Sequence, residues 1–185
     1  MPDGTPGLMP LKTGNIWYYQ KKMHDANGAV TATGNDTIAI VAAVVANNIV
    51  YFQLVWTSMP VSYQSFINNI DSVTVQKIDS VAKYTFFKKV SSDGAVDSWS
   101  DTVTSHCPGQ NQLYAYAGES TVNGYTGCLK NGITVNDCTS EAFQKWVYYL
   151  KPGVGLVRIE HYLVKDDRVT FYLDFEEDLK SYNLN

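Results

Sequence analysis

The chain has 185 residues, of which 45% are hydrophobic and 13% aromatic, and its formal net charge is −4. A chain of this length fits one domain that buries a sizeable core without needing disulfides. The sequence has no stripe of basic residues, which argues against a nucleic-acid partner. Its longest apolar run, residues 38–46, is far shorter than the roughly 20 residues of a transmembrane helix, so we expect no transmembrane segment.

The opening of the chain predicts a linker followed by a hairpin. Residues 1–10 are rich in glycine and proline, and we expect them to form an N-terminal linker. Residues 11–23 begin with a turn and continue as a strand in which Trp17 and Tyr19 share one face. The following turn, residues 25–28, ends in Asn-Gly, which is a strong signal for a hairpin.

A second hairpin is predicted around a pair of asparagines. Two apolar runs, residues 37–46 and 49–57, flank this pair and have the composition of strands. Alternation along the second run places Phe52 and Trp56 on the same side of the sheet.

Residues 60–80 fit two interpretations. The spacing of the apolar residues within 66–70 suits a short helix, and the alternative is a loop followed by a strand at residues 73–78. Beyond them, alternating apolar and polar residues predict two more hairpins, residues 83–90 with 96–103 and residues 113–117 with 121–130.

The most informative stretch is residues 146–160, with the sequence WVYYLKPGVGLVRIE. Two strand-like runs meet here at the turn Lys151-Pro152-Gly153, and Gly155 lets another backbone or a large ring come close. A last hairpin joins residues 155–164 to 169–175, and we expect a polar tail after it.

Turn signals that recur at short intervals, with few helical stretches between them, predict an antiparallel meander. We expect an all-β fold with a minor α component. Its single domain, residues 11–178, forms a curved sheet, a half-barrel or an open barrel, and residues 179–185 form a C-terminal tail.

Three motifs resemble a family of bacterial envelope proteins of unknown function, the TapB-like lipoproteins. Residues 10–18 (PLKTGNIWY) match its opening PLxxGNxWxY, residues 124–129 (GYTGCL) match a Gly-aromatic-x-x-Cys-Leu strand, and residues 148–157 (YYLKPGVGLV) match its closing PGVGLV. The resemblance implies a curved antiparallel sheet similar to the half-barrel of LolA-type lipoprotein carriers. It also implies export to the bacterial periplasm or cell surface, with a lipid anchor in the full-length precursor, although the anchoring cysteine is absent from this chain. It implies no catalytic residues.

Candidate catalytic and metal-binding groups are few. His106 beside Cys107 suggests a thiol–imidazole pair, but neighbours on an extended chain point to opposite faces, and a surface loop is the simpler interpretation. We expect His161 to be a sheet-face histidine hydrogen-bonded to a neighbour. The acidic run at residues 174–178 suits a solvated tail, with weak calcium binding as the alternative. The cysteines lack the spacing of a zinc site, so we expect no metal, no cofactor and no catalytic residue.

The three cysteines leave two interpretations open. Cys128 and Cys138 flank a predicted turn at Asn131-Gly132, and a disulfide between them would leave Cys107 free. The alternative is that all three are buried or half-buried thiols.

The surplus of aromatic residues is the stronger functional clue. Tryptophan and tyrosine on a concave sheet face can hold lipid chains or stack on sugars, because each has an apolar body and a polar tip. The alternative for each ring is a place in the core. The six residues that we expect to line a ligand-binding face are Trp17, Tyr19, Phe52, Trp56, Trp146 and Tyr148.

We therefore expect a non-enzymatic, exported bacterial envelope protein. Its curved sheet would bind a lipid, another apolar or amphipathic ligand, or an envelope protein partner. The alternative is a solid-packed structural or adhesive surface module. A hydrolase acting on envelope glycan is the third hypothesis, and a convergent pair of buried carboxylates in a cleft would favour it.

Overall fold

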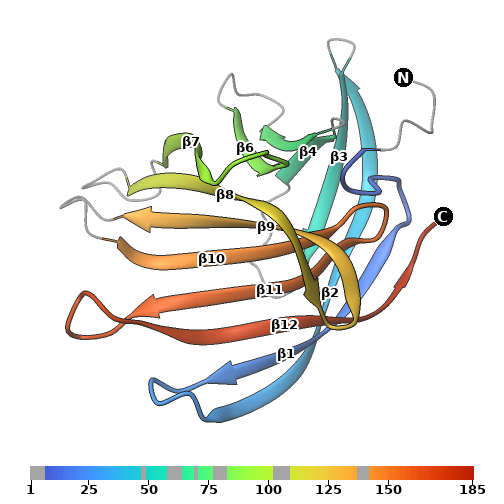
Figure 1. Ribbon diagram of the computed structural model, residues 1–185. Helices are drawn as coiled ribbons and strands as arrows, with labels where there is room; N and C mark the ends of the chain where they lie inside the picture. The colour runs from blue at the N-terminus through green and yellow to red at the C-terminus, as the bar shows by residue number, and fades with distance from the viewer. Residues whose placement is uncertain are drawn as a thin grey trace.

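The structure is a computed structural model that describes residues 7–46, 49–57, 64–68, 71–76, 83–101, 109–136 and 142–185. Every regular element in these ranges is a β-strand, and Figure 1 shows the strands curling into one sheet. None of the described segments forms a helix long and apolar enough to cross a membrane. The strands are β1 (Ile16–His24), β2 (Val30–Ala46), β3 (Ile49–Trp56), β4 (Gln64–Asn68), β5 (Ser72–Gln76), β6 (Lys83–Lys88), β7 (Gly94–Asp101), β8 (Gly109–Val122), β9 (Tyr125–Asn136), β10 (Ala142–Lys151), β11 (Gly155–Val164) and β12 (Phe171–Asn183).

The sheet is an antiparallel meander in which one pair of neighbouring strands is far apart in the sequence. Its order is β6-β5-β4-β3-β2-β1-β12-β11-β10-β9-β8-β7, so every neighbour is consecutive in the chain except the pair β1 and β12. Strands β1 to β6 therefore run outward to one edge, and β7 to β12 return from the other edge to the middle. The expected all-β, single curved meander is confirmed.

The two edge strands, β6 and β7, force the sheet to curl. Only residues 89–93 connect them, and a link of that length spans at most about 20 Å. The edges consequently lie close together in Figure 1, and the backbone N–H of Thr85 donates to Asp97 Oδ2 at 2.6 Å across the gap. No backbone ladder joins β6 to β7, which leaves the curl open. The predicted hairpin of residues 83–90 with 96–103 is therefore wrong, because each strand pairs on its other side.

Alternation along the strands creates an inner face and an outer face, and the inner face carries the core. Trp17 and Tyr19 are 0% and 2% exposed on the inner face, whereas Tyr18 between them is 44% exposed. Leu8 and Met9 are also buried in this core, so the expected linker is wrong from residue 8 onward. The N-terminal segment is held against β2, because Gly14 N–H donates to the carbonyl of Ile40 at 2.9 Å.

Local turn chemistry gave the predicted hairpins at both ends of the chain. Asp25 Oδ1 accepts the backbone N–H groups of Asn27 and Ala29, which closes the turn between β1 and β2. Val154 N–H donates to the Lys151 carbonyl at 3.0 Å in the turn between β10 and β11. Both turns are confirmed.

Three other local predictions are wrong. Residues 66–68 belong to strand β4, not to a helix, because Phe66 pairs with both Phe52 and Val75. The alternative strand at residues 73–78 is confirmed over its described part, which lies in β5. Asn131 and Gly132 lie in the middle of β9, where they pair with β8 and β10. The polar tail is the second half of β12, which pairs with β1 as far as Asn183.

Candidate functional site

A cluster of rings from four strands lies on the inner face, centred on Trp146 of β10. We call Trp56, Trp146, Tyr148, His161 and Phe175 the inner aromatic cluster. The Trp146 ring centroid lies 4.3 Å from that of His161, 5.5 Å from Phe175, 6.1 Å from Tyr148 and 6.2 Å from Trp56. Trp56 and Trp146 are only half-buried, so this part of the inner face is accessible to solvent.

A buried pair of acids lies beside the cluster. Glu177 of β12 is 0% exposed, Asp36 of β2 is 3% exposed, and a side-chain hydrogen bond joins them. Trp56 Nε1 donates to Asp36 Oδ2 at 2.7 Å, which ties the acids to the rings. Lys21 Nζ lies 3.3 Å from Glu177 Oε1 and 3.7 Å from the centroid of the Phe175 ring. The inner face therefore combines half-exposed aromatic surface with a cation and acids.

Burial governs the protonation of these groups. Burial, followed by the charge and hydrogen bond of Asp36, raises the pKa of Glu177 to about 8, and Lys21 acts in the opposite direction. Burial and the charges of Glu177 and Asp36 also hold the pKa of the Tyr19 hydroxyl well above its ordinary value. Burial lowers the pKa of His161, although its contact with Asp174 acts in the opposite direction. Near neutral pH the acid pair thus retains one proton, and Lys21 balances the remaining charge.

Both ring nitrogens of His161 have a hydrogen-bond partner. Its Nδ1 lies 2.9 Å from Asp174 Oδ2 and its Nε2 lies 3.1 Å from Gln144 Oε1. The side chain is thus fixed between β10 and β12, and the expectation of a hydrogen-bonded sheet-face histidine is confirmed.

The six residues predicted to line a ligand-binding face all lie on the inner face, but they divide into two groups. Trp17, Tyr19 and Tyr148 are buried members of the core. Trp17 Nε1 donates to the Val154 carbonyl at 2.5 Å, and the Tyr19 hydroxyl donates to the Leu156 carbonyl at 2.8 Å, so both rings are fixed in place. The half-buried members, which a ligand could reach, are Phe52, Trp56 and Trp146.

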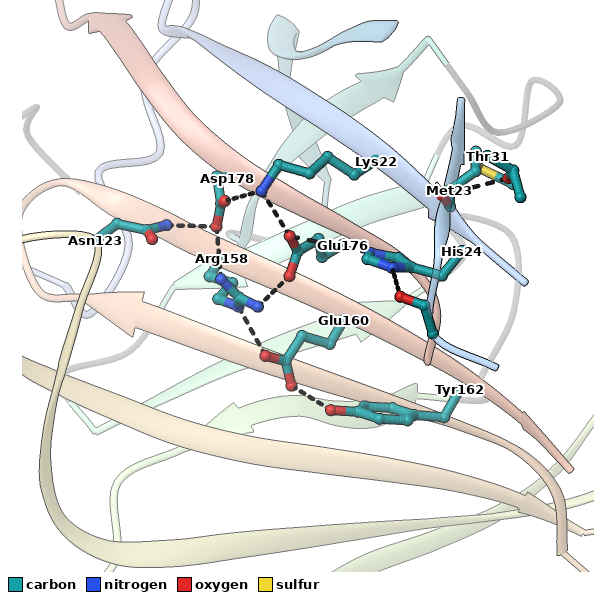
Figure 2. Close-up of polar contacts among 11 residues, drawn as sticks. Lys22, Met23, His24, Thr31, Asn123, Arg158, Glu160, Tyr162, Glu176 and Asp178 are labelled. Atoms are coloured by element: carbon teal, nitrogen blue, oxygen red, sulfur yellow. Dashed lines mark hydrogen bonds and ion pairs between the residues drawn. The ribbon is translucent and has the colours of Figure 1, made fainter. Parts of the chain in front are cut away.

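The outer face carries a separate polar cluster, the outer ionic network of Lys22, Arg158, Glu160, Glu176 and Asp178 (Figure 2). Arg158 contacts three carboxylates: Nε lies 2.7 Å from Glu160, Nη1 lies 3.0 Å from Asp178, and Nη2 bonds to Glu176. Lys22 Nζ lies 2.8 Å from Glu176 and 3.7 Å from Asp178. The network connects β1, β12 and β11.

The turn between β8 and β9 folds onto this network. Asn123 Nδ2 donates to Asp178 Oδ1 at 2.6 Å and to the Val157 carbonyl at 3.2 Å, as Figure 2 shows for the first contact. The Tyr162 hydroxyl donates to Glu160 at 2.8 Å, and burial followed by this hydrogen bond raises the Tyr162 pKa. The hydrogen bond with Glu176 raises the pKa of Lys22. The ion pairs join side chains of β1, β11 and β12, so the network holds these strands together.

The acidic run does not behave as one cluster. Alternation places Glu177 on the inner face and Glu176 and Asp178 on the outer face, where they bond to different partners. Asp174 contacts His161 because the pairing of β11 with β12 shifts by one residue at this point. The prediction of a solvated tail is wrong, because residues 176–178 are buried within β12. No group of three or more His, Cys, Asp and Glu side chains among the described residues is arranged to hold a metal ion.

Cys128 is a free thiol that is 0% exposed, and burial raises its pKa. The turn that was expected to bring it towards Cys138 is not formed. Strand β9 instead carries the chain straight on, and Cys128 and Asn136 lie eight residues apart, about 26 Å along an extended strand. The predicted turn, which was the reason to expect a disulfide between Cys128 and Cys138, is therefore wrong. Cys138, like His106 and Cys107, lies outside the described residues.

The sequence interpretation missed the charged residues of the inner face. Lys21 shares the alternation of Trp17 and Tyr19, and Asp36 shares that of Ile38 and Ile40. A charged residue in the same alternation as buried rings could have been identified from the sequence as an inner-face residue. Glu177 was hidden in an acidic run that resembled a tail.

Comparisons with known proteins identify the fold and no sequence family. No protein-family model matches the chain, and no curated protein matches it. A crystal structure of a candidate exported protein with a YmcC-like fold, from Bacteroides fragilis NCTC 9343, superimposes with a TM-score of 0.51 at 10% identity, covering 97% of this chain and 100% of that one. A candidate lipoprotein from Parabacteroides distasonis ATCC 8503 gives a TM-score of 0.46 at 15% identity with the same coverage. The chain is therefore similar in fold to the Bacteroides fragilis protein over nearly its whole length.

Proposed function

We propose that this protein is an exported component of the bacterial envelope that binds an amphipathic molecule on the inner face of its sheet and catalyses no reaction. The observation that carries the proposal is the half-buried pair Trp56 and Trp146, whose rings lie beside Lys21 and His161 on an otherwise packed face. The rings offer apolar contact area, and the cation and imidazole offer polar contacts to a head group.

Two likenesses support the location. The Bacteroides fragilis protein with the same fold is described as exported. The three motifs that resemble the TapB-like lipoproteins lie in the first strand, in β9 and across the turn between β10 and β11. Both favour the periplasm or the cell surface, and the resemblance to the TapB-like lipoproteins alone favours a lipid anchor in the precursor.

The geometry of the acids favours a binding role over hydrolysis. A glycosidase holds its two carboxyl groups about 5–9.5 Å apart across the sugar. Asp36 and Glu177 are bonded directly to each other and are almost completely buried. Such a pair stabilises Trp56 and Lys21 at the site and has no room for a substrate between its members.

A titration with monomeric lysophosphatidylcholine tests this proposal. We expect a saturable change in tryptophan fluorescence, and about tenfold weaker binding for Trp146→Ala, since burying an aromatic ring is worth about 1.5–3 kcal/mol. Phe143→Ala is the matched control, because Phe143 lies on the same strand but is 38% exposed. The absence of saturable binding, or equal weakening by both substitutions, would overturn the proposal.

A contact module packed solid is the second candidate. The complete burial of Trp17, Tyr19 and Leu150 on the inner face favours it, because these side chains leave that region without space for a ligand. Native mass spectrometry of protein extracted from its host separates the two: a co-purifying amphiphile supports binding, and protein of the bare chain mass supports the module.

A further inference from the structure

The hairpin of β2 and β3 extends beyond both of its neighbours. Strand β1 pairs with β2 only as far as Ala39, and β4 pairs with β3 only as far as Phe52. Past these points, among the described residues, the two strands pair only with each other, from Ala43 opposite Phe52 to Ala46 opposite Ile49. Figure 1 shows this end of the hairpin at the top of the view, standing clear of β8 to β11. We call residues 41–45 and 49–51 the hairpin tip.

The tip presents aliphatic side chains to solvent. Val41 is 47% exposed, Val45 is 70% exposed and Ile49 is 37% exposed, and no other element bears as many of the exposed large hydrophobic residues in the described part of the chain. The sequence from residue 37 to residue 70 contains no Asp, Glu, Lys, Arg or His. An uncharged apolar projection of this kind marks an interaction site.

The inner-face side of the hairpin is apolar along its length. Along the β2 and β3 ladder the same-face pairs are Ile38 with Trp56, Ile40 with Leu54, Ala43 with Phe52 and Val45 with Val50. Ile38, Ile40 and Leu54 are buried in the core, so they separate the exposed tip from the half-buried Trp56 of the inner aromatic cluster.

We propose that the hairpin tip docks on a lipid bilayer. The docking goes beyond the proposed function and stands on the tip alone. A bilayer suits the tip better than a protein partner does. Protein interfaces are rich in tyrosine, tryptophan and arginine, whereas the exposed residues in the described part of the tip are valine, alanine and isoleucine. The net charge of −4 gives no attraction to anionic lipids, so apolar insertion alone drives the docking.

Flotation of the full chain with phosphatidylcholine vesicles tests the docking. We expect binding that is unchanged between 50 and 500 mM salt, a range over which the Debye length falls from about 14 Å to about 4 Å. Val45→Asp should reduce partitioning about tenfold or more, because a charge enters the apolar layer. Val169→Asp, at a valine that is 80% exposed in the turn between β11 and β12, should leave it unchanged. Both positions are exposed, so both variants should fold.

Three outcomes overturn the inference: no flotation of the wild type, equal flotation of the two variants, or a self-associated wild type that Val45→Asp makes monomeric in sedimentation velocity. The last outcome would identify a second copy of the chain as the occupant. Titration of Val45→Asp with monomeric lysophosphatidylcholine separates this failure from failure of the proposed function, because a soluble monomer reaches the inner aromatic cluster without the tip.

Discussion

Substitution of Gly155 should disturb the core more than any nearby glycine does. Gly155 follows the turn between β10 and β11 with φ of +116°, and a Cβ there would lie 2.6 Å from Trp17 Nε1 and 2.9 Å from Trp17 Cε2. Trp17 is fully buried and its Nε1 is bonded to Val154, so the ring has little room to move. Gly155→Ala therefore combines about 1–3 kcal/mol of backbone strain with about 1–3 kcal/mol of overpacking. We expect a total loss of about 2–6 kcal/mol in the free energy of unfolding.

Urea denaturation followed by circular dichroism measures this loss, and Gly153→Ala is the matched control. Gly153 has φ of +77° but nothing within 4 Å of its Cβ position, so its substitution carries only the backbone strain, about 1 kcal/mol. The difference between the two variants combines the contact with Trp17 and the extra backbone strain at Gly155, where φ is +116° against +77° at Gly153, and the double change described next separates the two contributions. Adding Trp17→Phe to Gly155→Ala should cost less than the sum of the two single changes, because a smaller ring relieves the clash. Equal destabilisation by Gly153→Ala and Gly155→Ala would refute this account of the packing.

Three further predictions concern the buried polar groups. Glu177 has a folded pKa of about 8 against 4.5 ordinarily, so it contributes stability below pH 4.5 that is lost as the pH rises to 8; the free energy of unfolding from urea denaturation should fall over that range by at most about 1.4 kcal/mol per pH unit, and Glu177→Gln should flatten the profile. Arg158→Met should lower the free energy of unfolding by about 2–3 kcal/mol at pH 7, which is less than for a fully buried pair because the Arg158 side chain is 23% exposed, and by less again at pH 4. Lys180→Met, at an exposed position, is the control, and an equal loss in both variants would contradict the role of the network. Cys128 should resist iodoacetamide until the protein unfolds, and rapid native alkylation in a mass spectrum would show that its burial is wrong.

Local sequence signals predicted the parts of the fold that depend on neighbouring residues. The Asn-Gly turn after Asp25 and the Pro-Gly turn after Lys151 each restrict a few dihedral angles, so the hairpins around them follow from residues close in sequence. The period of two in a strand also placed Trp17 and Trp146 on the inner face.

The candidate site was predicted only in its aromatic half. Trp56 and Trp146 were identified because large rings on several strands are visible in the sequence. Asp36 and Glu177 lie far apart in the sequence and become a pair only because β1 lies between β2 and β12 in the sheet. No local pattern specifies that neighbourhood.

The sequence by itself determined that this chain forms alternating strands with a buried aromatic face, because alternation and turn chemistry act over a few residues. The tertiary structure alone decided that β12 joins β1, that the acidic residues after Phe175 are buried, and that β6 and β7 become opposite edges of the sheet. These features depend on which distant strands meet, and that choice is made by the burial of the whole inner face.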